Sequence, residues 1–139
     1  MNRSLGPILI IGLMGLFPCG PYASAQSSMS AQEIQANIIG NTISGMEHNE
    51  RYAEYLSPDG RILGRAESGP YSGTWHIEGD QLCVFYLAQE QGENTWECAT
   101  LKLNGNQLVW VEPNSGDFVT TLSKGNTEYL KFLPISQKE

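Results

Sequence analysis

The spacing of short apolar and aromatic runs after Gly40 is the feature that most constrains this fold. These runs are rich in β-branched and aromatic residues and are bounded by Gly, Asn, Asp and Pro, a pattern that predicts strands. They cover residues 42–46, 50–57, 61–66, 71–78, 81–87, 96–103, 107–112, 116–122 and 128–133. Apart from the long link before residue 96, two to five residues separate successive runs. Parallel strands need far longer crossovers, so successive strands must pair antiparallel.

An antiparallel meander of eight or nine short strands forms either a closed barrel or a pair of packed sheets. We expect an all-β fold, an eight-stranded up-and-down barrel, because closure removes exposed strand edges and hairpins alone can build it. The third and fourth strands are expected to turn at Gly69-Pro70. A capping-box pattern at Ser30 and Glu33, with Gly40 as a helix end, predicts one short helix over residues 31–39.

The first 25 residues have the layout of a cleavable signal peptide. Arg3 precedes an apolar run over residues 7–17, and Ala23-Ser24-Ala25 supplies small residues before a cut at Gln26. The run holds 11 residues, whereas a bilayer-spanning helix needs about 20, so we expect no stable membrane anchor. Lipidation of Cys19 is the alternative, and Pro18 disfavours it. We therefore expect a single domain over residues 26–139 that is periplasmic or secreted.

The charge of residues 26–139 restricts the partners of that domain. Seven basic and fifteen acidic residues give a net charge of 7 − 15 = −8. This sign opposes attraction to nucleic-acid phosphates and to anionic membrane surfaces. We expect a monomer whose partner is an unknown protein or small molecule.

Two cysteines remain after removal of the leader, Cys83 and Cys98, and an even pair in an oxidising compartment predicts a disulfide. The 15-residue separation corresponds to about 3 kcal/mol of loop-closure entropy. A hairpin centred between residues 90 and 91 places the two cysteines opposite each other. Strand alternation then puts Leu82 and Val84 in the core and the disulfide nearer the surface. A reactive or metal-binding thiol pair is disfavoured, because neither CxxC spacing nor a flanking histidine is present.

Few groupings of side chains suggest catalysis or metal binding. The segment 47–50 crowds His48 between two glutamates, but alternate residues of a strand diverge, and only His76 could add a ligand. The two histidines are the only candidate bases, and no serine lies in a nucleophile elbow. A carboxylate pair such as Glu54 with Glu67 is expected by chance on so acidic a surface. We therefore expect no enzyme, no catalytic residue, no metal and no cofactor.

Aromatic side chains are the remaining candidates for a binding surface, namely Trp96, Tyr52, Tyr55 and Trp75. Trp96 follows the long link and stands beside Cys98, where it either contacts a partner or covers the disulfide. Trp75 has a second interpretation as a core residue, because an indole buries a large area.

Two resemblances extend these expectations. The strand start Gly73-Thr74-Trp75 resembles one that recurs in lipocalins, in the avidin family and in small bacterial inhibitors of secreted metalloproteases. The order of glycines and aromatics from Gly40 to Cys98 is similar to that of small exported proteobacterial proteins without an assigned activity. The second resemblance implies an exported β domain and supplies no catalytic residue.

Together these features predict a non-enzymatic periplasmic or secreted binding domain. A lipocalin-like version would carry a small apolar ligand in a cavity of at least about 300 Å³. An inhibitor-like version would have a filled interior and would insert residues 26–30 into the cleft of an enzyme. An enzyme with an unrecognised site is the third alternative, and its polar residues would converge in one pocket.

Overall fold

The computed structural model of the protein describes residues 26–87 and 95–127. The predicted signal peptide, Cys19, most of the 88–95 link and the ninth run at 128–133 lie outside these residues and stay predictions. In the described parts, no helix has the length and apolar composition needed to cross a bilayer. The elements are α1 (Ala31–Asn37), β1 (Asn41–Glu47), β2 (Glu50–Leu56), β3 (Arg61–Ala66), β4 (Gly69–Glu78), β5 (Gln81–Leu87), β6 (Glu97–Asn104), β7 (Gln107–Val111) and β8 (Phe118–Lys124).

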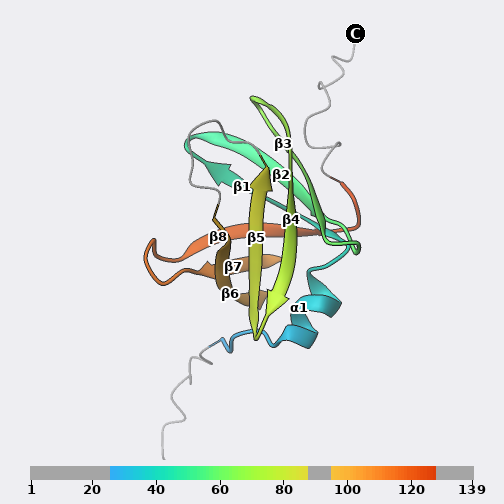
Figure 1. Cartoon of the computed structure of the whole chain (residues 1–139). Coiled ribbons are helices and arrows are strands. Elements are labelled where there is room, and N and C mark those ends of the chain that lie inside the picture. The colour runs from blue at the N-terminus through green and yellow to red at the C-terminus, as the bar shows by residue number, and fades with distance from the viewer. Residues whose placement is uncertain (1–25, 88–94, 128–139) are drawn as a thin grey trace, which may run out of the picture.

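The eight strands form a closed antiparallel barrel, as the turn spacing predicts (Figure 1). Each strand pairs with the next in sequence, and β1 pairs with β8 through four residue pairs that close the barrel. Thr42 reinforces this closure, since its hydroxyl donates to the Gly125 carbonyl at 2.7 Å and accepts from the Thr127 amide at 2.8 Å. Every strand of the barrel pairs with a neighbour on each side over at least part of its length, which limits the usual route to edge-to-edge aggregation.

One predicted turn is wrong. Gly69 and Pro70 belong to β4, where they pair with Ala66 and Arg65, and the turn lies at Glu67 and Ser68. Proline lacks an amide hydrogen and is tolerated near the end of a strand, where few ladder bonds need it. The described pairing of β4 with β5 begins only at Ser72, so Pro70 lies in the part of β4 for which pairing is described with β3 alone.

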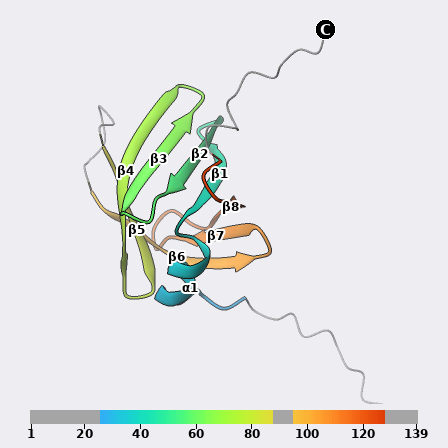
Figure 2. The ribbon, with the colours of Figure 1, turned by 90° about the vertical axis from the view of Figure 1, so that its right-hand side faces the viewer.

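Helix α1 covers one end of the barrel, which we call the closed end (Figures 1 and 2). Ser30 is its N-cap and forms the predicted capping box with Glu33. Ile34 and Ile38 have no exposed surface and join the apolar core. The helix ends two residues before the predicted limit, with Ile38 as C-cap, and Gly40 takes the positive φ of 83° that leads the chain into β1.

The core fills the closed half of the barrel with apolar side chains. Strand alternation places Leu82, Val84, Ala99 and Leu101 inside, as predicted, with at most 6% of each residue exposed. The other buried members of the core are Met29, Ile34, Ile38, Ile39, Ile43, Leu56, Ile62, Leu108 and Trp110. The opposite end, which we call the open end, carries the β1–β2 and β3–β4 turns.

Cys83 and Cys98 are directly paired across β5 and β6 and form the predicted disulfide. They lie on the outer face of the barrel wall, also as predicted. Cys83 nevertheless has no exposed surface, so the expectation of a disulfide near the surface holds only for Cys98.

Candidate functional site

Among residues 26–87 and 95–127, one carboxyl group, that of Glu54, is buried inside the barrel above the apolar core. Tyr52, Glu54 and Leu56 alternate along β2, and because Leu56 lies in the core, Glu54 faces the same interior. Only 2% of Glu54 is exposed. An ionised carboxylate in such a place is costly unless the protein or a ligand compensates its charge.

Two tyrosines hold this carboxyl group. The Tyr71 hydroxyl donates to Oε2 of Glu54 at 3.1 Å, and the Tyr86 hydroxyl lies 3.0 Å from Oε2 and 3.1 Å from Oε1. Their rings meet edge to face with centroids 5.8 Å apart. A carboxylate offers about four acceptor positions, and the two hydroxyls supply one hydrogen each. Within 26–87 and 95–127 no Lys, Arg or His pairs with Glu54, so both acceptor capacity and charge remain uncompensated there.

Gly64 makes the position of Tyr71 possible. Gly64 stands opposite Glu54 on one side and Tyr71 on the other, in adjacent ladders of β2, β3 and β4. A Cβ atom at position 64 would lie 2.1 Å from the Tyr71 ring, so the ring occupies the space where any other residue would place its side chain. The missing side chain thus lets Tyr71 lie across β3 and reach Glu54.

Burial shifts the protonation of the whole cluster. Burial raises the pKa of Glu54 to about 7, against the lowering effect of the hydrogen bonds from Tyr86 and Tyr71, and the negative charge of Glu47 raises it further. Burial, followed by the charge of Glu54, raises the pKa of Tyr86 well above its usual value. Near neutral pH the tyrosines are therefore neutral donors, while Glu54 is divided between its acid and its anion.

Further carboxylates surround the open end. Burial raises the pKa of Glu97, and the charges of Glu112 and Glu47 raise it further. By strand alternation Glu47, Glu50 and Glu97 face inward at this end. In the described strands, the charged residues that face inward at the open end are all acidic. These carboxylates make a negative contribution to the electrostatic potential at the entrance.

A shallow hollow of about 390 Å³ lies on the outer wall, beside the strands that carry Tyr71 and Tyr86. Pro70, Tyr71, Ser72 and Leu87 line it, at the open ends of β4 and β5. Pro70, Ser72 and Leu87 face outward by strand alternation, so the hollow opens away from the interior, and Tyr71 separates it from the Glu54 carboxyl group.

The structure places the four predicted binding residues in different environments. Only Tyr52 faces the interior near Glu54, and burial, followed by the charge of Glu54, raises the pKa of this tyrosine. Tyr55 faces outward on β2 by alternation. Trp75 packs against the core and donates from Nε1 to the Ser57 carbonyl at 2.8 Å. Trp96 is 47% exposed on the outer wall, with its ring against His76 at 4.3 Å. These residues therefore do not form one surface.

The candidate acid, base and metal groups are also separated. His48 lies at the β1–β2 turn with 92% of its side chain exposed, 3.8 Å from Glu47, and His76 lies on the outer face of β4. Glu67 forms an ion pair with Arg51 at 2.7 Å, whereas Glu54 bonds to tyrosines inside the barrel. Neither histidine is placed to act on Glu54.

The cluster of Glu54 with Tyr71 and Tyr86 is the grouping that the sequence does not reveal. The sequence does indicate that Glu54 lies on the inner face of its strand, because Leu56, two residues later, is strongly apolar and belongs inside. The positions of Tyr71 and Tyr86 could not be predicted. They depend on the register of the three hairpins that connect β2 to β5 and on the missing side chain at Gly64.

Comparisons with protein families, with curated protein sequences and with solved structures find no match for this chain. The resemblances to exported proteobacterial proteins and to lipocalin-like strand starts therefore stay predictions.

Proposed function

We propose that this protein is a non-enzymatic, periplasmic or secreted binding barrel that takes a small organic cation, such as an amine, at its open end. Glu54 is the counter-ion of the bound cation, and Tyr71 and Tyr86 hold the carboxylate in place. The observation that carries the proposal is a 2% exposed carboxyl group with neutral partners and no basic partner among the described residues.

A cationic ligand matches both the charge and the hydrogen bonding of this site. An ammonium group brings N–H donors for the acceptor positions on Glu54 that the two hydroxyls leave free. It also neutralises the one charge that burial disfavours. The rings of Tyr52, Tyr71 and Tyr86 stand around the carboxyl, and aromatic faces attract organic cations. The inward carboxylates at the open end increase the local concentration of cations.

The alternative of an apolar carrier is less favoured by the interior. Apolar side chains and α1 fill the closed half, and the interior of the open half contains the Glu54 carboxyl group. A buried hydrocarbon would leave the acceptor positions of Glu54 without a partner, which costs free energy.

The alternative of a protease inhibitor depends on a free N-terminal arm over residues 26–30. Met29 is 6% exposed, and its amide donates to the Leu101 carbonyl at 2.8 Å. The Ala31 amide also donates to Asp80 at 2.8 Å. These bonds leave only residues 26–28 free to enter a cleft, so the interior site is the better candidate.

Export is part of the proposal. The Cys83–Cys98 disulfide is of the kind that persists in oxidising compartments, and it supports a periplasmic or secreted location together with the predicted leader.

Three ligands of equal chain length test the charge preference: butylammonium, butanol and butyrate. Isothermal titration at pH 8 should detect binding of butylammonium alone. A hydrogen bond to a charged group contributes about 1.5–3 kcal/mol, so Glu54→Gln should weaken this binding about 10- to 100-fold. Asp117→Asn is the matched control, since Asp117 is an exposed carboxylate outside the barrel strands, and it should leave the affinity unchanged.

The pH dependence adds a second criterion. Affinity for butylammonium should rise as pH increases through about 7, because the ionised form of Glu54 is the binding form. Equal affinity for butanol would favour the apolar carrier instead. Binding of none of the three ligands, or an unchanged affinity in Glu54→Gln, would contradict the proposed site.

A further inference from the structure

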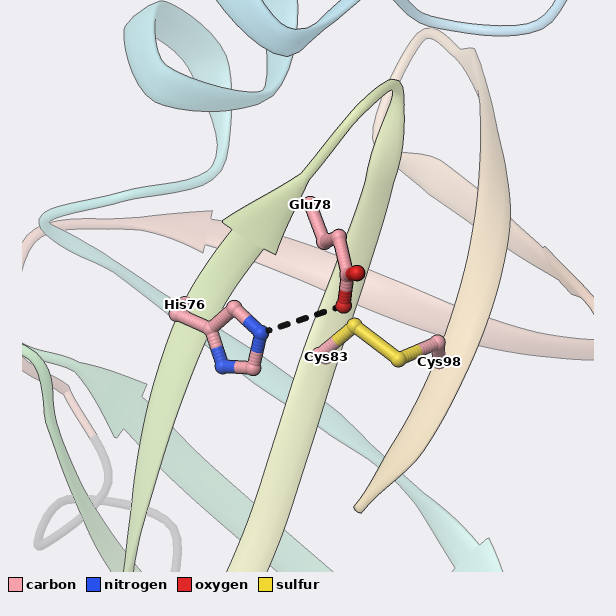
Figure 3. Close-up of a disulfide and its surroundings, with 4 residues drawn as sticks. All are labelled: His76, Glu78, Cys83 and Cys98. Carbon is pink, nitrogen blue, oxygen red and sulfur yellow. Dashed lines mark ion pairs between the residues drawn. A yellow bond between two sulfur atoms is a disulfide. The ribbon is translucent and has the colours of Figure 1, made fainter.

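Four potential zinc ligands lie together on the outer wall of the barrel, away from the Glu54 site. His76 on β4 pairs with Cys83 on β5, which pairs with Cys98 on β6, so the three residues form one row across three neighbouring strands. Glu78 follows two residues after His76 and projects from the same face of β4. Figure 3 shows the imidazole and the carboxylate directed toward the sulfur of Cys83.

The donor atoms are already close to the separation that zinc requires. One ligand atom each from His76, Glu78 and Cys83 lie within 4.8 Å of one another, and Nε2 of His76 is 3.6 Å from Oε2 of Glu78. Zinc binds nitrogen and oxygen at about 2.0–2.2 Å and sulfur at about 2.3 Å, so tetrahedral ligands stand about 3–4 Å apart. The Nε2–Oε2 separation already lies in this range, and side-chain rotation would bring the remaining ligand atoms into it.

The disulfide decides whether this site can bind a metal. While Cys83 and Cys98 are bonded to each other, only His76 and Glu78 offer strong ligands, and zinc sites need three or four. Reduction converts the same two sulfurs into the thiolates that zinc prefers, without any change of strand register. The presence of the ion and the presence of the disulfide are therefore mutually exclusive.

We propose that reduction of the Cys83–Cys98 disulfide creates a zinc site formed by both cysteine sulfurs, Nε2 of His76 and a carboxylate oxygen of Glu78. The reductant is a dithiol, which gives two electrons and two protons to the protein disulfide and itself becomes a disulfide. The protein then holds two thiols. Zinc binding displaces their two protons to solvent, so each sulfur binds the metal as a thiolate.

The surrounding structure favours an ordered site. The barrel is closed by hydrogen-bonded ladders on every side, so β5 and β6 stay adjacent when the sulfur bond opens. The ring of Trp96 packs edge-on against His76 at 4.3 Å and restricts the orientation of the imidazole. Cys83 has no exposed surface, which shields one thiolate from solvent. Two thiolates and one carboxylate carry three negative charges and zinc carries two positive charges, so the net charge of the site is −1.

The test measures zinc affinity of the oxidised and the reduced protein by competition with a chromogenic chelator. The full chain carries Cys19→Ser in every sample, so that Cys83 and Cys98 are its only thiols, and a phosphine serves as reductant because it does not bind zinc strongly. Reduced protein should bind one equivalent of zinc at least about 100-fold more tightly than oxidised protein. Cobalt in place of zinc should give the visible bands of a tetrahedral site with sulfur-to-metal charge transfer.

Two variants separate a four-ligand site from two thiolates acting alone. His76→Gln and Glu78→Gln should each lower zinc affinity at least about 10-fold. Loss of a residue that only hydrogen-bonds to a metal ligand already costs about that much, and loss of a ligand should cost no less. His48→Gln is the matched control, since His48 also lies beside a glutamate but on the β1–β2 turn, and it should bind zinc like the parent protein. Near-ultraviolet circular dichroism reports whether each reduced protein is folded.

Three results would overturn the proposal. The first is zinc binding by the reduced protein that is unchanged in both His76→Gln and Glu78→Gln. The second is zinc binding of equal strength by the oxidised protein. The third is a reduced protein whose circular dichroism signal is lost and is not restored by zinc. None of these results bears on the Glu54 site, which lies inside the barrel.

Discussion

Replacement of Glu54 by glutamine should abolish a specific part of the pH dependence of stability. In the folded protein burial raises the pKa of Glu54 to about 7, from a usual value of 4.5. The folded state therefore holds the proton more tightly than the unfolded state. The contribution of Glu54 to stability is fully present below pH 4.5 and is lost as pH rises through about 7.

The size of this effect follows from the shift itself. One pKa unit corresponds to 1.36 kcal/mol, so a rise from 4.5 to about 7 gives a loss of about 3 kcal/mol between pH 4.5 and pH 8. Glu54 is buried, so solvent does not screen this contribution. A carboxamide cannot ionise, and Glu54→Gln should therefore lack this part of the pH dependence while keeping an acceptor for Tyr86.

Urea unfolding at a series of pH values measures the effect. The difference in unfolding free energy between the parent protein and Glu54→Gln should fall by about 3 kcal/mol as pH rises from 4.5 to 8. Titrating groups that are not coupled to Glu54 cancel in this difference. Asp117→Asn provides the control and should follow the parent protein. A difference that stays constant with pH, or that grows in favour of the parent protein at high pH, would refute the burial of an uncompensated carboxyl group.

Three further substitutions test the local contacts that build the barrel. Gly64→Ala should lower the free energy of unfolding in urea by about 1–3 kcal/mol, because the added Cβ would meet the Tyr71 ring. It should also alter the near-ultraviolet circular dichroism of the tyrosines. An unchanged spectrum would contradict the packing of that ring on β3. Ser30→Ala should cost about 1 kcal/mol through loss of the capping box of α1, and a neutral result would mean that the cap contributes nothing. Trp110→Phe removes the 2.9 Å hydrogen bond from Nε1 to Thr120 and should cost about 1 kcal/mol beyond the change in buried area, whereas Trp96→Phe, on the outer wall, should cost less.

The barrel could be predicted because local rules determine it. Links of two to five residues force antiparallel neighbours, and the pairing of Cys83 with Cys98 follows from counting outward from the centre of one hairpin. The capping box could be predicted for the same reason, because its hydrogen bonds join Ser30 and Glu33, which lie within four residues of sequence. The turn at Gly69-Pro70 was wrong, because glycine and proline are typical of turns yet are also accepted near the end of a strand.

The candidate site depends on long-range register, which the sequence does not specify. Glu54 meets Tyr86 across 32 residues, and a shift of one residue in any intervening ladder would turn one of the two side chains to the outer wall. The row of His76, Cys83 and Cys98 depends on two ladders in the same way. Residue types alone therefore suggested a binding surface of Trp96, Tyr52, Tyr55 and Trp75, of which only Tyr52 lies beside Glu54.

The most direct measurement is a pH titration of the Glu54 side-chain carboxyl carbon by nuclear magnetic resonance, with and without saturating butylammonium. Free protein should show a midpoint of about 7. Bound cation should move the midpoint downward, because it stabilises the ionised carboxylate. A midpoint near the usual 4.5 that does not respond to butylammonium would contradict the proposed counter-ion.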